Sequence, residues 1–222
     1  MASLTFDAAI FDFDETMIEL EAQHAAASDA LCREMGSDFY ALPESFRLSS
    51  GRRILDEVRE LRERFGWTRP VDELMTIRQG HFRAACRAAD LQLLPCVEDV
   101  VRALRAAGLR LAIASSAVGD EIDEILRRLG IRDAFALIVD GVEVTRAKPD
   151  PEPYLVAARK LGVAPERCIV FEDSHVGVVA AKRAGAYCIA VRNPRAHFAQ
   201  DLSMADVILN SMCELTLEHF AR

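Results

Sequence analysis

Two aspartates, Asp12 and Asp14, lie directly after the first apolar run of the sequence, in a segment (residues 11–16) that reads FDFDET. Residues two apart in an extended chain point to the same side, so both carboxylates would face one region of the molecule. A single aspartate in such a place is most often a helix cap or an Asx turn. Two aspartates followed by Thr16 make a chemical site the better interpretation.

Polar residues also end two later apolar runs, and a lysine stands in a stiff segment between them. Glu172 and Asp173 follow one run, and Ser115 and Ser116 follow the other. Each of these pairs could be no more than the N-cap of the helix that comes next. Lys148 is followed by a proline, whose ring stiffens the backbone and would hold the lysine in place. Taken alone, it would be an ordinary solvated side chain.

The charge of these residues, if they meet at one edge of a sheet, indicates a metal site. Four carboxylates carry −4 and the lysine returns +1, so their pKa values must rise or a cation must bind. Oxygen ligands without His or Cys favour a hard ion, Mg²⁺ in particular. A metal, a lysine, a serine hydroxyl and a helix N-terminus together suit a phosphoryl group. A free aspartate beside them could then form an aspartyl phosphate.

Short apolar runs predict the strands that position these residues. Their alternation with helical patterns predicts an α/β fold: a doubly wound, Rossmann-like parallel sheet with right-handed crossovers and helices on both faces. Each expected helix is followed by a glycine, the usual stop signal. The expected strands are 8–13, 109–114, 136–139, 168–171, 187–191 and, more weakly, 207–209. The expected helices between them are 97–107, 119–129, 151–161 and 176–184.

One long segment breaks this alternation. About 95 residues separate the first two expected strands, and they contain helical patterns at 17–35, 53–65 and 71–89. A crossover between parallel strands needs only one helix. We therefore expect residues 18–91 to form a helical cap domain, and residues 1–17 and 92–222 to form the α/β catalytic core. The insertion begins at the carboxyl end of the first strand, where open parallel sheets bind their ligands.

The overall composition is that of a globular protein with an acidic balance of charge. The 222 residues include 35 Asp and Glu against 27 Lys and Arg, which gives a net charge of −8. This balance argues against nucleic acid as a partner, and no apolar stretch approaches the roughly 18 residues of a membrane helix. We expect a cytoplasmic protein that binds neither nucleic acid nor membrane, and we expect it to be a monomer.

The cysteines are scattered and form neither a CxxC pair nor a zinc-binding pattern. Most of them have apolar neighbours, so we interpret them as reduced thiols buried in a cytoplasmic protein. The six are Cys32, Cys86, Cys96, Cys168, Cys188 and Cys213.

Taken together, the ordered motifs resemble those of the haloacid dehalogenase superfamily, and more closely its branch of β-phosphoglucomutase-like phosphatases. The first motif is the segment 11–16, the second is Ser115, the third is the pair Lys148-Pro149, and the fourth is the segment 171–177, which reads FEDSHVG. The resemblance covers nearly the whole chain. Each motif alone is a weak signal, whereas the ordered set is a specific one.

The resemblance implies a role for each polar residue at the strand ends. Asp12 would be the nucleophile and a ligand of Mg²⁺, and Asp14 would be the general acid and base, with its backbone carbonyl on the metal. Asp173, with Glu172, would complete the metal site. The residues that would order the loop or hold the transferring phosphoryl group are Thr16, Ser115, Ser116 and Lys148.

The resemblance is less complete in the loops around the site. Glu15 stands where the family most often has glycine, which eases a tight turn, and Cys96 also replaces a common glycine. Residues 50–53, which read SGRR, resemble a cap loop that meets substrate in relatives. Arg52 and Arg53 are therefore both candidate substrate contacts, although a solvated helix face is the ordinary place for such arginines. His24 could gate the hinge or meet substrate, and a structural histidine is about as good an interpretation.

These observations favour a Mg²⁺-dependent phosphatase that acts on a small phosphate ester, of the sugar or polyol type. A phosphomutase is the main alternative, because it would use the same residues and return the phosphoryl group to the substrate. A hydrolytic dehalogenase would leave the acidic cluster without a purpose, since its chemistry needs no metal. A phospho-receiver switch would not need the helical insertion, and a catalytically silent binding protein would not need both aspartates.

Overall fold

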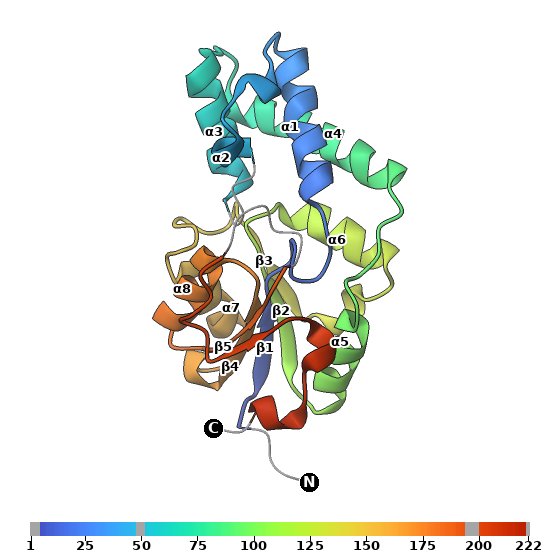
Figure 1. Cartoon of the computed structure of the whole chain (residues 1–222), viewed down its shortest axis with the longest axis vertical. Coiled ribbons are helices and arrows are strands. Elements are labelled where there is room, and N and C mark those ends of the chain that lie inside the picture. The colour runs from blue at the N-terminus through green and yellow to red at the C-terminus, as the bar shows by residue number, and fades with distance from the viewer. Residues whose placement is uncertain (1–4, 48–51, 194–199, 221–222) are drawn as a thin grey trace.

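The computed structural model of this protein describes residues 5–47, 52–193 and 200–220. Its centre is one sheet of six strands, all parallel, in the order β3-β2-β1-β4-β5-β6 (Figure 1). The predicted α/β fold with a doubly wound parallel sheet is therefore confirmed. The strands are β1 (Ala8–Phe11), β2 (Arg110–Ala114), β3 (Leu137–Val139), β4 (Cys168–Glu172), β5 (Tyr187–Val191) and β6 (Val207–Leu209).

Helices cover both faces of this sheet. The helices α5 (Val97–Ala106) and α6 (Gly119–Arg128) pack on one face, and α7 (Glu152–Leu161) and α8 (His175–Arg183) pack on the other. Successive residues of β1 alternate between the two layers, so the strand is apolar at every position and fully buried. This explains why the strands are continuous apolar runs in the sequence, with no alternation of polar residues.

Of the helices between β1 and β2, all except α5 gather at one end of the molecule, beyond the carboxyl ends of the strands (Figure 1). They build a hydrophobic cluster that belongs almost entirely to them, with residues such as Leu31, Val58, Trp67 and Leu74. We refer to residues 18–91 as the helical segment. Its helices are α1 (Glu21–Glu34), the single turn α2 (Glu44–Arg47), α3 (Ile54–Phe65) and α4 (Val71–Ala88).

The chain enters and leaves the helical segment side by side. Ile18 forms an antiparallel bridge with Leu93, and the N–H of Leu94 donates to the carbonyl of Met17 at 2.8 Å. Residues 17–20 are therefore a linker, and the first helix begins at Glu21, four residues later than its pattern predicts. The first strand likewise ends at Phe11, two residues earlier than predicted, because the chain leaves the sheet there to form the loop that carries the aspartates.

The interpretation of all six cysteines as reduced, buried thiols is wrong for two of them. Cys96 and Cys213 form a disulfide, while the other four are free and buried. The two partners are 117 residues apart in the sequence. They meet because the segment after β6 returns to pack against α5, a contact that no local pattern reveals.

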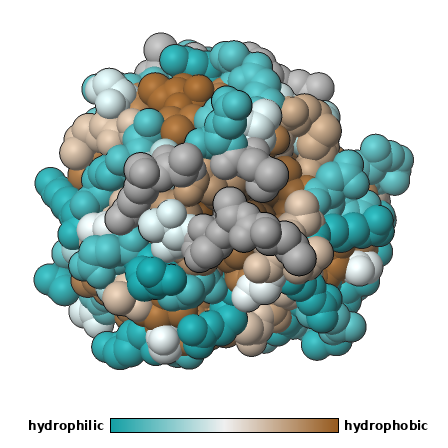
Figure 2. All heavy atoms as spheres, turned by 90° about the horizontal axis from the view of Figure 1, so that it is seen from below, coloured by the Kyte–Doolittle hydropathy of each residue, from teal (hydrophilic) through white to brown (hydrophobic). Residues whose placement is uncertain are grey.

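The surface is polar with scattered apolar areas. Viewed from the end opposite the helical segment, hydrophilic side chains are interleaved with smaller hydrophobic patches (Figure 2). Within the described part of the chain, no helix combines the length and the apolar character needed to cross a membrane.

Candidate active site

The polar residues predicted from the strand ends do come together. Strand β1 lies between β2 and β4, and Phe11 is in register with both Ile113 and Phe171. The residues that follow these three positions therefore emerge at one edge of the sheet, facing the helical segment. They divide into a buried cluster and a more exposed pair.

The buried cluster consists of Asp12, Glu172 and Asp173, whose carboxylate oxygens lie within 4.8 Å of one another. Lys148 Nζ donates to Asp12 at 2.6 Å and to Glu172 at 2.7 Å. Thr16 Oγ1 donates to Asp173 at 3.1 Å and lies 3.3 Å from Asp12. The three carboxylates carry −3 and the lysine +1, so a charge of −2 remains in a site that water scarcely reaches.

The pKa values of this cluster follow from that charge. Burial raises the pKa of Asp12 to about 7; Lys148 lowers it, whereas Glu172 and Asp14 raise it further. Burial and the neighbouring carboxylates also raise the pKa of Asp173. Although burial alone would lower it, the two carboxylates beside it raise the pKa of Lys148, so the lysine stays charged. Asp12 and Asp173 thus repel each other's charge, and the lysine offsets only part of it. A divalent cation bound between them would supply the missing positive charge.

Glu172 anchors the cluster through both of its oxygens. One accepts from Lys148 and from the Tyr154 hydroxyl, the latter at 2.5 Å. The other accepts from Ser174 Oγ at 3.0 Å and from the backbone N–H groups of Asp173 and Ser174. Burial would raise the pKa of Glu172, but the lysine and these hydrogen bonds outweigh it and lower the pKa. With five donors already in place, Glu172 positions Lys148, and the oxygens best placed for a metal belong to Asp12 and Asp173.

Asp14 lies apart from the cluster, at the rim of the site, where about a quarter of its side chain is exposed. Its carboxylate faces His24 Nε2 at 3.2 Å and accepts from Ser115 Oγ at 3.4 Å. Arg78 Nη2 lies 3.3 Å from the other nitrogen of the same ring, His24 Nδ1. Because a guanidinium can only donate, Nδ1 is the acceptor and the proton sits on Nε2, which donates to Asp14.

Glu15 adopts the left-handed backbone conformation that glycine favours, with φ = 61°. Its carboxylate accepts from the N–H groups of Leu20 at 2.8 Å and Glu21 at 3.0 Å, and from Asn193 Nδ2 at 2.9 Å. Two of these donors are unsatisfied N–H groups at the start of α1. The glutamate thus offsets its backbone strain by capping the first helix of the helical segment, so this departure from glycine keeps the tight turn.

A cavity of about 100 Å³ separates the strand ends from the helical segment. Asp12, Asp14 and Asp173 line it on the sheet side, together with Ser116. The opposite wall is formed by residues of the helical segment that include His24, Ser28, Phe39, Arg47, Arg52 and Glu57. The helical segment therefore covers the aspartates and does not pack against a sheet face away from them.

The two neighbouring arginines of the helical segment have different surroundings. Arg52 lines the cavity, stacks on Phe46 with 4.0 Å between the guanidinium carbon and the ring centroid, and has a buried Nε without a hydrogen-bond partner among the described residues. Arg53 instead donates to both oxygens of Asp56 at 2.8 Å and to the carbonyl of Val144 at 3.0 Å, which ties α3 to the core. Of the SGRR loop, residues 50 and 51 lie outside the described residues.

The family model that matches this chain is the haloacid dehalogenase-like hydrolase, over residues 6–185. The chain belongs to this family. The match spans all four motifs and the helical segment, and it confirms the resemblance drawn from the motifs. The protein is thus an enzyme, a phosphoric monoester hydrolase of the haloacid dehalogenase type, as its phosphatase relatives also indicate.

Individual relatives cover between about half and almost all of the chain of this haloacid dehalogenase-like hydrolase. Hexitol phosphatase B of Escherichia coli is 31% identical over 218 residues, which is 94% of each chain. A β-phosphoglucomutase of Bacillus subtilis is 35% identical over 126 residues, which is 57% of this chain and 53% of that one. The crystal structure of CbbY from Rhodobacter sphaeroides in complex with xylulose-1,5-bisphosphate covers 98% of this chain and all of that one, with a TM-score of 0.85 and 26% identity.

Sequence reasoning missed two residues that shape the site of this hydrolase. Tyr154 and Arg78 are buried helix residues, and their partners lie on other elements, so nothing in their sequence surroundings marks them. Gly177, by contrast, was visible as the last residue of the fourth motif. A β-carbon at this position would overlap the carboxylate of Glu172, which explains why the motif ends in glycine.

Proposed function

We propose that this protein is a Mg²⁺-dependent phosphatase that hydrolyses a small sugar or polyol phosphate through an aspartyl phosphate on Asp12. One observation carries the proposal: two carboxylates of the same loop line one cavity in opposite environments. Asp12 is buried and held by Lys148, whereas Asp14 is partly exposed and faces His24. Such a pair is what an enzyme needs to divide the tasks of nucleophile and proton carrier.

In the first step, an oxygen of Asp12 attacks phosphorus and the bond to the ester oxygen breaks. Asp14, in its protonated form, gives its proton to the departing alcohol. In the second step, Asp14 takes a proton from water as the water oxygen attacks the aspartyl phosphate, which releases inorganic phosphate and restores Asp12. Lys148, with Ser115 and Ser116, would hold the phosphoryl oxygens, and the Nε2–H of His24 would hold Asp14 toward the cavity.

Three carboxylates and one lysine leave the site too negative to accept a phosphate dianion unaided. Mg²⁺ held by Asp12, Asp173 and the backbone carbonyl of Asp14, with Glu172 behind them, would supply the missing positive charge and stabilise the charge that develops on the phosphoryl oxygens.

Two observations support the substrate class. The relatives named above include a hexitol phosphatase and a protein crystallised with xylulose-1,5-bisphosphate. The wall of the cavity opposite the aspartates also offers hydrogen-bonding side chains, Ser28, Arg52 and Glu57, which suit the hydroxyl groups of a sugar or polyol. We further propose that residues 18–91 act as a cap that closes over the substrate, and residues 1–17 and 92–222 as the catalytic core.

Phosphomutase activity is the second candidate, because a relative named β-phosphoglucomutase matches more than half of the chain. A mutase would need the same nucleophile and the same acid–base residue. It would differ only in returning the phosphoryl group to a hydroxyl of the sugar before water reaches it.

The deciding experiment uses the purified protein, a panel of sugar and polyol phosphates, and Mg²⁺. We expect phosphate release that stops in excess EDTA and returns when Mg²⁺ is restored. Nuclear magnetic resonance of the same mixtures would detect an isomerised sugar phosphate. Phosphate release undiminished in EDTA would contradict the metal dependence, and an isomer formed without phosphate release would favour the mutase.

A further inference from the structure

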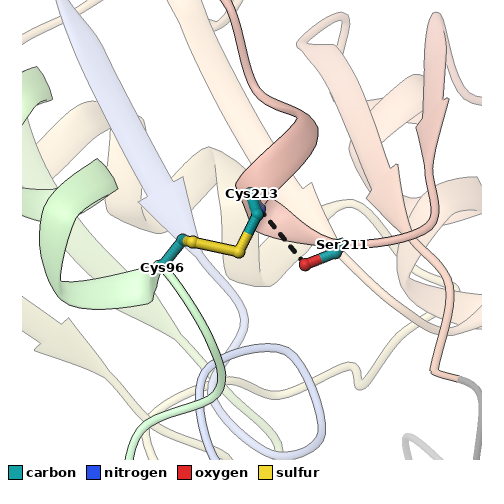
Figure 3. Close-up of a disulfide and its surroundings, with 3 residues drawn as sticks. All are labelled: Cys96, Ser211 and Cys213. Atoms are coloured by element: carbon teal, nitrogen blue, oxygen red, sulfur yellow. Dashed lines mark hydrogen bonds between the residues drawn. A yellow bond between two sulfur atoms is a disulfide. The ribbon is translucent and has the colours of Figure 1, made fainter.

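Two of the six cysteines differ from the others in access to solvent. Cys213 is exposed and Cys96 is partly exposed, and these two are joined by the disulfide (Figure 3). The four free cysteines are buried, and burial raises the pKa of Cys32 and Cys86 to about 12 and that of Cys168 to about 11. Because the thiolate is the reactive form, the four buried thiols are inert, and thiol chemistry is confined to the accessible pair.

The backbone at Cys96 is costly for any residue other than glycine. Its φ is 63°, in the left-handed region, at the position that caps α5. Its side chain makes no capping hydrogen bond. A residue with a β-carbon pays a steric cost in this conformation, whereas glycine, which has none, adopts it freely. The cysteine is thus present at a strained position where its only evident benefit is the bond to Cys213.

The disulfide joins two parts of the chain that are otherwise only packed together. Cys96 lies two residues beyond Leu94, whose N–H pairs with Met17 at the base of the two linkers. Cys213 lies in the 3-10 turn Met212–Glu214 that follows β6, where its N–H donates to Ser211 Oγ at 3.2 Å (Figure 3). A cavity of about 460 Å³ runs between α5 and this turn, and both cysteines line it. Small reagents can therefore reach the bond.

We propose that Cys96 and Cys213 are a reversible thiol–disulfide site, which a low-molecular-weight disulfide such as glutathione disulfide oxidises and a dithiol reduces. The thiolate of Cys213 attacks the reagent disulfide, forms a mixed disulfide and releases one reagent thiol. The thiolate of Cys96 then attacks the sulfur of Cys213 and releases the second reagent thiol. The two protein thiols lose two protons and two electrons, and the reagent disulfide gains both. Oxidation fastens the C-terminal turn to the base of the linkers, and reduction frees it.

The test uses the full-length protein, equilibrated with either glutathione disulfide or dithiothreitol. Alkylation in denaturant followed by mass spectrometry should find four reactive thiols in the oxidised protein and six in the reduced protein. The melting temperature should fall by about 10 °C on reduction, since the bond closes a loop of more than one hundred residues. Six thiols after oxidation, or equal melting temperatures in the two states, would overturn the proposal.

Two variants separate the bond from the turn that carries it. Cys213→Ser should melt at one temperature in both reagents, close to that of the reduced wild type. Cys96→Gly removes the bond and also relieves the left-handed residue, so in dithiothreitol it should melt a few degrees above the reduced wild type. If Cys96→Gly melts below the reduced wild type, the cysteine has another structural use there, and the argument from backbone strain fails. The thiol count of the wild type decides the proposal even if a variant does not fold.

Discussion

The two walls of the active-site cavity are built in different ways. On the sheet side, every carboxylate of the buried cluster has a fixed partner: Lys148 bridges Asp12 and Glu172, and Thr16 contacts Asp12 and Asp173. On the helical side, Arg52 lines the cavity, and its Nη groups donate to Glu60 and to the carbonyl of Phe46, but its Nε has no hydrogen-bond partner among the described residues. Buried polar atoms are rarely left this way. The sheet side thus presents a fixed set of groups that suits chemistry, whereas the helical side lines the cavity with polar side chains such as Ser28, Arg52 and Glu57, which suit the recognition of a substrate.

Replacing the proposed nucleophile, Asp12, tests the sheet side most severely. Asp12→Asn should lower the rate of phosphate release by about a thousandfold or more, because an amide cannot form the acyl phosphate and the uncatalysed reaction is extremely slow. The fold should survive, since the asparagine still accepts from Lys148 and one buried charge is removed. Steady-state rates and a thermal melt measure both effects. A variant with a tenth of the wild-type rate would place the nucleophile elsewhere.

A glycine in α8 tests whether the rigidity of the sheet side matters. Gly177→Ala would push a β-carbon into the Glu172 carboxylate, which is fully buried and holds Lys148. We expect a loss of about 3 kcal/mol in the free energy of unfolding and at least a tenfold loss of activity. Gly80→Ala in α4 is the matched control, because nothing lies within 4 Å of its added carbon. It should stabilise the protein by about 1 kcal/mol. If Gly177→Ala and Gly80→Ala changed stability and activity equally, the overlap with Glu172 would not be the cause of the loss.

The pair of arginines tests the helical side. Arg52→Ala should raise KM by about five- to tenfold and change kcat by less than about threefold, because Arg52 lines the wall of the cavity opposite the aspartates. Arg53→Ala should leave the substrate profile unchanged and lower the free energy of unfolding by about 2 kcal/mol, because its hydrogen bond to Val144 joins α3 to the core. Kinetics over the substrate panel and urea unfolding distinguish the two. An unchanged profile in Arg52→Ala would move specificity elsewhere in the helical segment.

A buried acid at the junction of the two sides, Glu121, gives an effect on stability that depends on pH and leaves the catalytic groups in place. Neither carboxylate oxygen of Glu121 has a hydrogen-bond partner in the described chain. Burial raises its pKa from 4.5 to about 7; Arg78, His24 and Arg83 lower it, and Asp14 raises it. Between pH 4.5, the ordinary pKa, and about pH 7, the pKa in the folded protein, the folded protein keeps a proton that the unfolded chain releases. The stability that this group contributes at low pH is therefore lost as the pH rises through about 7.

Glu121→Gln removes that dependence on pH. From pH 5 to pH 8, the difference in the free energy of unfolding between variant and wild type should shift by about 2 to 3 kcal/mol in favour of the variant. Urea titrations of both proteins at the two pH values measure it, and comparing the two pH values cancels any fixed cost of the amide. If the free energies of unfolding of variant and wild type changed equally between the two pH values, Glu121 would have no raised pKa in the folded protein.

Sequence reasoning reached the sheet side of the site more fully than the helical side, for a physical reason. Parallel strands with two buried faces are plain apolar runs, and their carboxyl ends must share an edge, so the meeting of Asp12, Lys148 and Asp173 follows from local patterns. The bonds of Tyr154 to Glu172 and of Arg78 to His24 depend on how helices pack across many residues, and neither leaves a local trace. The three main helices of the helical segment were also predicted, whereas the single turn α2 is too short to show a period.

The position of β1 in the sheet has a consequence for how the chain acquires its structure. This strand is synthesised first, yet its two neighbours begin only at residues 110 and 168. The helices of residues 18–91 have a hydrophobic cluster of their own, so their contacts are close in sequence and can form early. Strand β1 therefore cannot pair on both edges until β4 has been synthesised, and Asp12 lacks its neighbours Glu172 and Asp173 until then. We therefore expect any truncation before residue 173 to abolish activity, because it removes Asp173 from the proposed site.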